Sequence, residues 1–132
     1  MSRFFPMEEL RYEWLADELA VCRLTPASPV PDWLPPSGFT TVTRTSEELS
    51  VVCRAEAVPT DVKSETGWAA LKVLGPLPFD AVGILRRFAA PLADADIPII
   101  AIGTFDTDYV LVKAVQKPEA DRVLSKRGLV CG

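Results

Sequence analysis

An α+β fold with two β-rich lobes in tandem is predicted from three features of the chain. Runs of β-branched residues recur along its whole length, which is typical of short strands. Two amphipathic helical patterns occur, and both lie in the second half. The first half instead carries five prolines between residues 25 and 38, which exclude a long helix there. A helix-poor lobe followed by a complete one is therefore expected.

The first half is expected to begin with an arm and to continue as strands. Residues 1–14 are polar and aromatic and are assigned to an N-terminal arm. The apolar run of residues 15–24 predicts a strand, and the proline-rich segment after it predicts an ordered connector with at most one helical turn near Asp32. Residues 39–45 and 48–54 are β-rich runs separated by a polar turn, which predicts a hairpin.

The second half begins, after a loop over residues 55–67, with a strand and a helix. Apolar and polar residues alternate over residues 67–74, which predicts a half-buried strand. Apolar residues then recur at spacings of three and four over residues 81–92 and predict an amphipathic helix of about four turns, with Asp80 as a candidate N-cap. Pro91 lies inside this helix and is expected to bend it.

The remaining elements complete a recurring order. Residues 97–103 and 109–114 are β-branched runs joined by a TFDTD turn. Residues 116–127 predict a second helix with Pro118 in its first turn, and a short apolar end predicts a last strand. From residue 68 onward the order is βαββαβ, the ferredoxin-like plait, in which two helices cover one face of an antiparallel sheet.

A weak internal repeat relates the two halves. When Thr45 is overlaid on Thr104, Val51 falls on Val110. On this pattern the first lobe is the same plait with its first helix shortened to a turn. The expected organisation is an N-terminal arm over residues 1–14, an N-terminal lobe over residues 15–66 and a C-terminal lobe over residues 67–132.

Composition argues against several classes of function. The chain of 132 residues carries 14 basic and 18 acidic residues, and this balance disfavours DNA, RNA and anionic membranes as partners. Histidine is absent, which removes the usual general base and the usual metal ligand. No nucleotide-binding glycine motif occurs. We therefore expect no metal, no cofactor and no enzymatic activity.

The cysteines and the start of the chain indicate the cytoplasm. The start lacks the basic residues and apolar core of a secretory signal, and no apolar stretch approaches the ~18 residues that a membrane helix needs. Cys22, Cys53 and Cys131 are odd in number and far apart, and we expect them to be small buried hydrophobes in a reducing compartment.

Three segments resemble a known family. They are GPLPFDAVGIL at residues 75–85, ADADIPIIAIGTFDTDYVLVKA at residues 93–114 and FTTVTRTSEELSVVC at residues 39–53. Together they resemble the ACT-domain proteins, most closely the small tandem-ACT group related to the regulatory domains of aspartate kinases and to the animal cytosolic arginine sensor. The sharpest element of the resemblance is the TFDTDYVLV stretch.

The resemblance implies a regulatory domain that binds an amino acid and associates side by side with a second copy, as a homodimer. Amino acids then lie between lobes, held by the start of the first helix and by the turn after the second strand. Carried over to this chain, the implied ligand-binding residues are Phe79, Asp80, Ala81, Val82, Gly83, Ile84, Thr104, Phe105, Asp106, Thr107 and Asp108. The arginine sensor has an acidic residue at the position of Ala81, which argues against arginine as the ligand here. A regulated enzyme or another protein is a further expected partner.

The chemistry of these two segments is compatible with a zwitterion. A helix N-terminus offers unpaired N–H groups and about half a positive charge, so the amides of residues 81–83 could hold a carboxylate. Asp106 or Asp108 could pair with an α-ammonium group. The alternative is ordinary turn chemistry, in which Asp and Thr side chains bond the local backbone and Asp80 only caps its helix.

Three functions are compatible with these residues. The first is a regulatory amino-acid-binding module that acts through ligand-sensitive association. The second is a protein-interaction subunit that has kept the fold without a ligand, and the lack of side-chain acids at Ala81 and Val82 favours it. The third is a small enzyme, supported only by the presence of Asp106, Asp108 and Tyr109. We expect the first.

Overall fold

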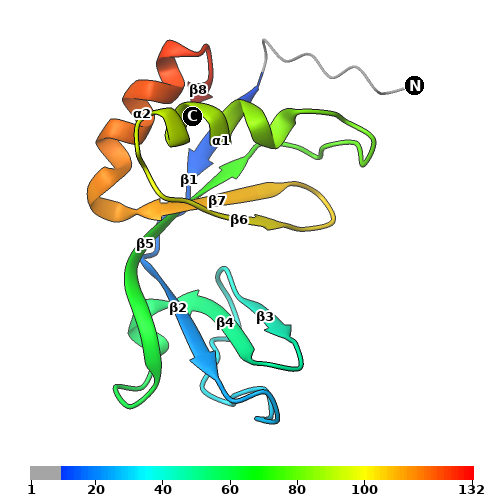
Figure 1. Cartoon of the computed structure of the whole chain (residues 1–132), viewed down its shortest axis with the longest axis vertical. Helices are drawn as coiled ribbons and strands as arrows, with labels where there is room; N and C mark the ends of the chain where they lie inside the picture. The colour runs from blue at the N-terminus through cyan, green and yellow to red at the C-terminus, as the bar shows by residue number, and fades with distance from the viewer. Residues whose placement is uncertain (1–9) are drawn as a thin grey trace. The chain divides into compact units, whose positions relative to one another are not determined.

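The structure, a computed structural model, describes residues 10–132 (Figure 1). These residues divide between two compact units. The C-terminal unit comprises Ala69–Gly132 together with the chain up to Leu15, and the N-terminal unit comprises Ala16–Trp68. The strands are β1 (Arg11–Trp14), β2 (Leu19–Leu24), β3 (Thr41–Arg44), β4 (Leu49–Arg54), β5 (Lys63–Val73), β6 (Ile100–Gly103), β7 (Asp108–Lys113) and β8 (Val130–Cys131). The helices are α1 (Ile84–Asp94) and α2 (Lys117–Lys126), with short 3-10 turns η2 (Ala55–Ala57) and η3 (Ala114–Gln116).

The N-terminal unit is an antiparallel sheet in the order β3–β4–β2–β5. The predicted hairpin is confirmed as β3 and β4. Residues 25–40 form turns but no helix, so the connector lacks the single helical turn that the sequence allows near Asp32. Trp33 and Leu34 from this connector pack instead against the buried residues of β2 and β4. The connector thereby covers the sheet where a plait would have its first helix.

Strand β5 begins earlier than the sequence predicts. The predicted loop over residues 55–67 contains η2 and the first residues of β5, which starts at Lys63. This part of β5 pairs with β2, with Ser64 opposite Cys22. Lys63 and Glu65 are exposed, so the segment has no alternating apolar pattern. Backbone pairing with β2, rather than burial of side chains, makes these residues a strand.

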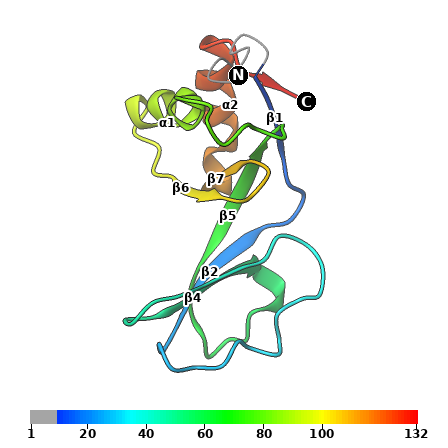
Figure 2. The same cartoon turned by 90° about the vertical axis from the view of Figure 1, so that its right-hand side faces the viewer.

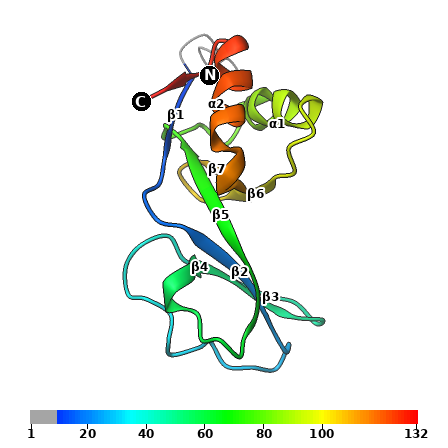
Figure 3. The same cartoon turned by 90° about the vertical axis from the view of Figure 1, so that its left-hand side faces the viewer.

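In the C-terminal unit, two helices cover one face of a sheet in the order β8–β1–β5–β7–β6. Figures 2 and 3 show α1 and α2 on the same side of β1 and β5. Phe88 and Leu92 of α1, with Ala120 and Leu124 of α2, are buried against the sheet. The predicted βαββαβ order is confirmed as β5, α1, β6, β7, α2 and β8.

The predicted N-terminal arm is in part a strand of the C-terminal unit. Residues 11–14 form β1, which lies antiparallel to β5 and parallel to β8. Leu10 and Tyr12 are buried in the same core as α1 and α2. The alternation of exposed and buried residues in β1 covers only four residues, which is too short to be recognised as a pattern. Residues 1–9 of the predicted arm lie outside the described residues.

The two units repeat their elements in the same register. When Thr45 is overlaid on Thr104, the bounds of β3 fall on those of β6, the bounds of β4 fall on those of β7, and η2 falls on η3. The overlay found in the sequence therefore also relates the hairpins of the two units. Only the C-terminal hairpin is followed by an α-helix, α2, within residues 10–132.

Two of the three cysteines behave as expected. Cys22 and Cys53 are free and buried in the N-terminal unit, whereas Cys131 is free and exposed on β8. Burial raises the pKa of the Cys22 thiol to about 11, and the neighbouring Cys53 acts in the same direction. Cys22 therefore remains a protonated, apolar packing group, while the expected burial of Cys131 is wrong.

Tyr12 joins β1 to α2 through a hydrogen bond. Its hydroxyl donates to Asp121 Oδ1 at 2.5 Å, and the indole N–H of Trp14 donates to the same oxygen at 2.9 Å. Tyr12 is 1% exposed, and its ring packs edge-on against Phe88 with centroids 5.9 Å apart. Burial, followed by the hydrogen bond to Asp121, raises the pKa of Tyr12 well above its ordinary value.

We expect Tyr12→Phe to lower the free energy of unfolding by about 1.5–3 kcal/mol, because a buried hydrogen bond to a carboxylate is lost. The folded state favours the neutral phenol, so the stabilisation is full below the unfolded pKa of about 10 and is lost as pH rises above it. Urea unfolding between pH 8 and pH 11 should therefore show a steeper decline for the wild type than for the variant. Parallel curves would contradict this role.

Candidate ligand-binding site

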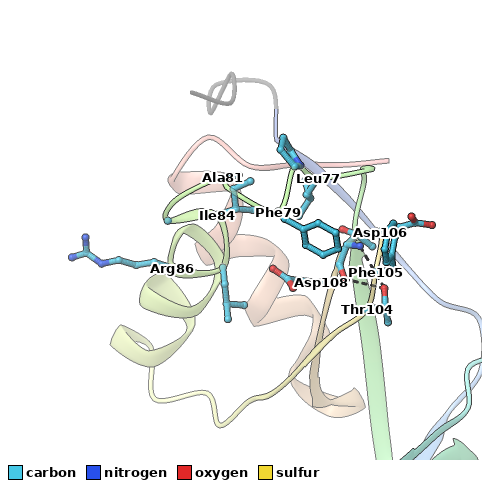
Figure 4. Close-up of a pocket in the computed structure, with 13 residues that line it drawn as sticks. Leu77, Phe79, Ala81, Ile84, Arg86, Thr104, Phe105, Asp106 and Asp108 are labelled. Atoms are coloured by element: carbon cyan, nitrogen blue, oxygen red, sulfur yellow. Dashed lines mark hydrogen bonds between the residues drawn. The ribbon is translucent and has the colours of Figure 1, made fainter. Parts of the chain in front are cut away.

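A cavity of about 250 Å³ lies in the C-terminal unit between the start of α1 and the turn that joins β6 to β7 (Figure 4). Nine of the eleven residues predicted from the sequence line it, whereas Asp80 and Val82 do not. The sequence did not single out Leu77, Pro78, Leu85 and Arg86, which also line the cavity. The two segments that the sequence predicts to form a site are therefore adjacent in the fold.

The turn between β6 and β7 is held by its two threonines. The N–H and hydroxyl of Thr104 both donate to the carbonyl of Thr107, at 2.9 and 3.0 Å. Thr107 is 4% exposed, and its hydroxyl donates to the carbonyl of Val73 on β5 at 2.5 Å. The N–H of Leu77 donates to the carbonyl of Asp106 at 2.7 Å. The turn is thus attached both to β5 and to the segment that leads to α1.

The first threonine of the equivalent turn in the N-terminal unit makes the same two hydrogen bonds. The N–H and hydroxyl of Thr45 both contact the carbonyl of Glu48, at 2.9 and 3.5 Å. Residues 16–68, which make up that unit, contain no α-helix that could face the turn. Because the pattern occurs in both units, the threonine at the start of each turn has a structural role. For Thr104 the geometry agrees with the turn-chemistry alternative.

Asp108 is a charged residue at a position where the other hairpin has an apolar one. Its counterpart in the overlay of the hairpins is Leu49, which is fully buried in the N-terminal unit. Asp108 instead lines the cavity and is only half-buried, and its carboxylate points toward the start of α1 in Figure 4. The facing residue, Gly103, has no side chain, and a Cβ there would lie 3.3 Å from Asp108 Oδ1. The C-terminal hairpin therefore presents a carboxylate where the other buries a leucine.

Helix α1 begins later than predicted. Gly83 is its N-cap residue, with a left-handed φ of 82°, and no side chain caps the helix, so the proposed capping role of Asp80 is wrong. The N–H of Ala81 donates to the carbonyl of Pro78 at 3.1 Å, and the first intrahelical bond is from Arg87 N–H to the Gly83 carbonyl. The amides of residues 84–86, rather than those of residues 81–83, are the first-turn donors of this helix.

The electrostatics of the cavity combine a helix N-terminus with a carboxylate. The first turn of α1 contributes a partial positive charge, and Asp108 lies on the opposite wall. Arg86 begins on the cavity wall, but its side chain points away from the cavity in Figure 4. A positive and a negative wall face each other, which is the arrangement that a zwitterion requires.

Two aromatic side chains lie exposed at this cavity. Phe79 and Phe105 are 77% and 78% exposed and contact each other edge-on, with ring centroids 4.8 Å apart. Val82, next to this cavity, is also exposed. Exposed aromatic residues in contact with each other are typical of surfaces that are covered by a ligand or a partner.

Neither a metal centre nor a membrane-spanning helix lies in the part of the chain that the structure describes. Within residues 10–132, no three acidic or cysteine side chains come together as a metal site. In the same range, no helix has the length and apolar character needed to cross a membrane.

Comparison with protein families matches both parts of the chain. Residues 63–126 match the model of an ACT domain, and residues 17–61 match the model of an N-terminal domain. A curated relative is human cytosolic arginine sensor for mTORC1 subunit 1, which is 40% identical over 72 residues. That match covers 48% of this chain and 22% of the sensor, so the chain spans about a fifth of the length of this relative.

Solved structures match nearly the whole chain. A crystal structure of a protein from Agobacterium tumefaciens is 32% identical, covers 93% of this chain and 92% of its own, and has a TM-score of 0.88. The regulatory subunit of aspartate kinase from Thermus thermophilus shares the fold at 10% identity, with a TM-score of 0.54 and coverage of 84% and 93%. The predicted fold class is thereby confirmed.

We expect Thr107→Val to destabilise the protein by about 1–3 kcal/mol, because the carbonyl of Val73 loses its donor and the shape of the side chain is kept. Thr107→Ser retains the hydroxyl and should cost clearly less. Urea unfolding of both variants measures the difference. Equal destabilisation by valine and serine would show that the methyl group, and not the hydrogen bond, holds the turn.

Proposed function

Because this chain belongs to the ACT-domain family, we propose that it is a regulatory module that binds a free amino acid in the cavity between α1 and the β6–β7 turn. Its relatives support this proposal, since one is an arginine sensor and another is the regulatory subunit of an aspartate kinase. The observation that carries it is Asp108, a carboxylate on the cavity wall at the position where the repeated hairpin buries Leu49.

The geometry supports a specific orientation of the ligand. The α-carboxylate would accept hydrogen bonds from the first-turn amides of α1, at residues 84–86. The α-ammonium would pair with Asp108 across the cavity. Gly83 has no side chain and leaves the backbone at the helix start open to a ligand. The ligand side chain would then lie toward Phe79 and Phe105 at the exposed side of the cavity.

Regulation would proceed through association. Phe79, Val82 and Phe105 are exposed apolar side chains at or beside the cavity, and a second copy of the chain could cover them. A ligand bound beneath these side chains would change the affinity of the copies for each other if it contacts the two states differently. A homodimer with the ligand near its interface is our proposed active form, and a regulated enzyme or another protein is its target.

The same exposed Phe79–Phe105 pair favours the alternative function, a protein-interaction subunit without a ligand. Both functions use the same surface, but only the first requires Asp108 and the amides of α1. The two relatives named above, a sensor and a regulatory subunit, lend no support to a catalytic role. Binding and association experiments therefore distinguish the two.

We expect one or a few of the twenty amino acids to stabilise the protein in a thermal-shift screen. A ligand at about 100 times its Kd adds about 2.7 kcal/mol to the free energy of unfolding. Asp108→Leu should abolish this response without loss of fold, because Leu49 occupies the equivalent place in the other hairpin. Glu47→Gln, in the turn of the N-terminal unit, serves as the control and should keep the response.

The outcomes of this screen separate the possibilities. A flat response of the wild type to all twenty amino acids would favour the interaction subunit. A ligand response that survives in Asp108→Leu would place the binding site elsewhere on the molecule.

We expect sedimentation velocity to show a dimer whose dissociation constant changes about 5- to 150-fold when the stabilising amino acid is added, as for a coupling energy of about 1–3 kcal/mol. Phe105→Ser should weaken the dimer because it removes an exposed aromatic contact. Val30→Ser removes an exposed apolar side chain from the N-terminal unit and is the control. A monomer at all concentrations, with and without ligand, would contradict regulation by self-association.

A further inference from the structure

The outer surface of the two helices carries a basic groove that shares only Gly83 and Arg86 with the cavity of the proposed function. Two cavities, of about 400 Å³ and 280 Å³, lie along α1 and α2 and share Pro91 and Arg127 in their walls. We call the two together the helix-face groove. Its cations are Arg86 and Arg87 from α1, Arg122 and Lys126 from α2, and Arg127 at the end of α2.

The groove has an excess of positive charge. Its five cations face two carboxylates, Asp94 and Glu119. Glu119 pairs with Arg122 at 2.5 Å and Asp94 pairs with Arg127 at 3.3 Å. Arg86 and Lys126 form no ion pair with the other residues described, so the groove keeps uncompensated positive charge on both helices, although the whole chain has a net charge of −4. The fold brings these side chains from two helices together along one groove.

The groove also has an apolar floor. Ala90 and Pro91 of α1 line its first part, and Ala95 and Val123 line its second part. Small apolar residues between arginine side chains accept the methyl and methylene groups of a peptide, which inorganic phosphate does not have. Arginine also forms two parallel hydrogen bonds with a carboxylate, so Asp and Glu side chains suit the walls.

We infer that the helix-face groove binds a short acidic segment of a partner protein. The cations are spread along two helices instead of converging on one point, which fits several carboxylates in sequence better than a single small anion. A long nucleic acid or an anionic membrane would extend beyond the groove and meet the rest of an acidic chain, which repels it. A short acidic peptide meets only the basic region.

Fluorescence anisotropy with a labelled peptide of alternating Glu and Ala tests this inference at an ionic strength of about 0.15 M. The matched probe is the same peptide with Gln in place of Glu. We expect the wild type to bind the acidic peptide and not the neutral one. The assay contains no amino acid, and the groove shares only Gly83 and Arg86 with the proposed ligand site, so peptide binding and amino-acid binding are measured separately.

Charge reversal identifies the surface. Arg86→Glu combined with Lys126→Glu changes one cation on each helix and should weaken binding by at least roughly tenfold, since two ion pairs become repulsive. Arg11→Glu combined with Lys63→Glu makes the same change in net charge at exposed strand positions outside the groove. This control should weaken binding by less than about threefold, through long-range repulsion alone.

Three results would overturn the inference. The first is equal binding of the acidic and neutral peptides by the wild type. The second is equal weakening by the groove variant and its control. The third is a single-stranded oligonucleotide that binds as tightly as the acidic peptide, which would make the groove a general polyanion site. If the groove variant unfolds at a lower temperature than the wild type, Arg86→Gln combined with Lys126→Gln is used in its place. This second variant removes the same charges without introducing repulsion.

Discussion

The shape of the candidate site depends on one hydrogen bond, which the buried hydroxyl of Thr107 donates. By donating to the carbonyl of Val73, it attaches the β6–β7 turn to the central strand of the C-terminal unit. The carbonyl of the preceding residue, Asp106, accepts the N–H of Leu77 and so holds the chain that leads into α1. Both walls of the cavity are therefore positioned by one turn. Loss of this hydrogen bond would leave a buried polar group unpaired, which costs more free energy than an ordinary hydrogen bond contributes. The folded state therefore strongly favours the attached turn.

The two units share one hairpin geometry but differ in what surrounds it. Each has a hairpin whose turn begins with a threonine that bonds the residue three positions later, and the elements correspond in the same register. In the N-terminal unit, the strand after the turn begins with the buried Leu49, and the proline-rich connector packs against the sheet. In the C-terminal unit a helix of full length replaces the connector, and its N-terminus faces a carboxylate. The binding chemistry that we propose would thus depend on a few residues placed around a shared turn geometry.

The first turn of α1 belongs to both sites that we infer. Gly83 and Arg86 line the cavity and also line the helix-face groove. The backbone of this turn faces the cavity, whereas the side chain of Arg86 points away from it. A ligand that accepts hydrogen bonds from these amides would therefore fix the backbone that carries Arg86, which is one of the cations of the groove. This shared element offers a direct route by which a bound amino acid could influence a protein partner.

The local pattern of the chain was sufficient for the repeat, both helices and the hairpins, because each has a strong periodicity or a distinctive turn. The two segments that meet at the cavity were identified through the family resemblance. The local pattern was not sufficient for β1 or for the start of β5, since these short or polar strands exist through their partners. The start of α1 was also misplaced, because the left-handed Gly83, and not the acid at Asp80, begins the helix. Only the tertiary structure showed that Asp108 replaces a buried leucine and that five cations line one groove. Those facts depend on which faces of distant segments meet, and that is decided by packing rather than by any local run of residues.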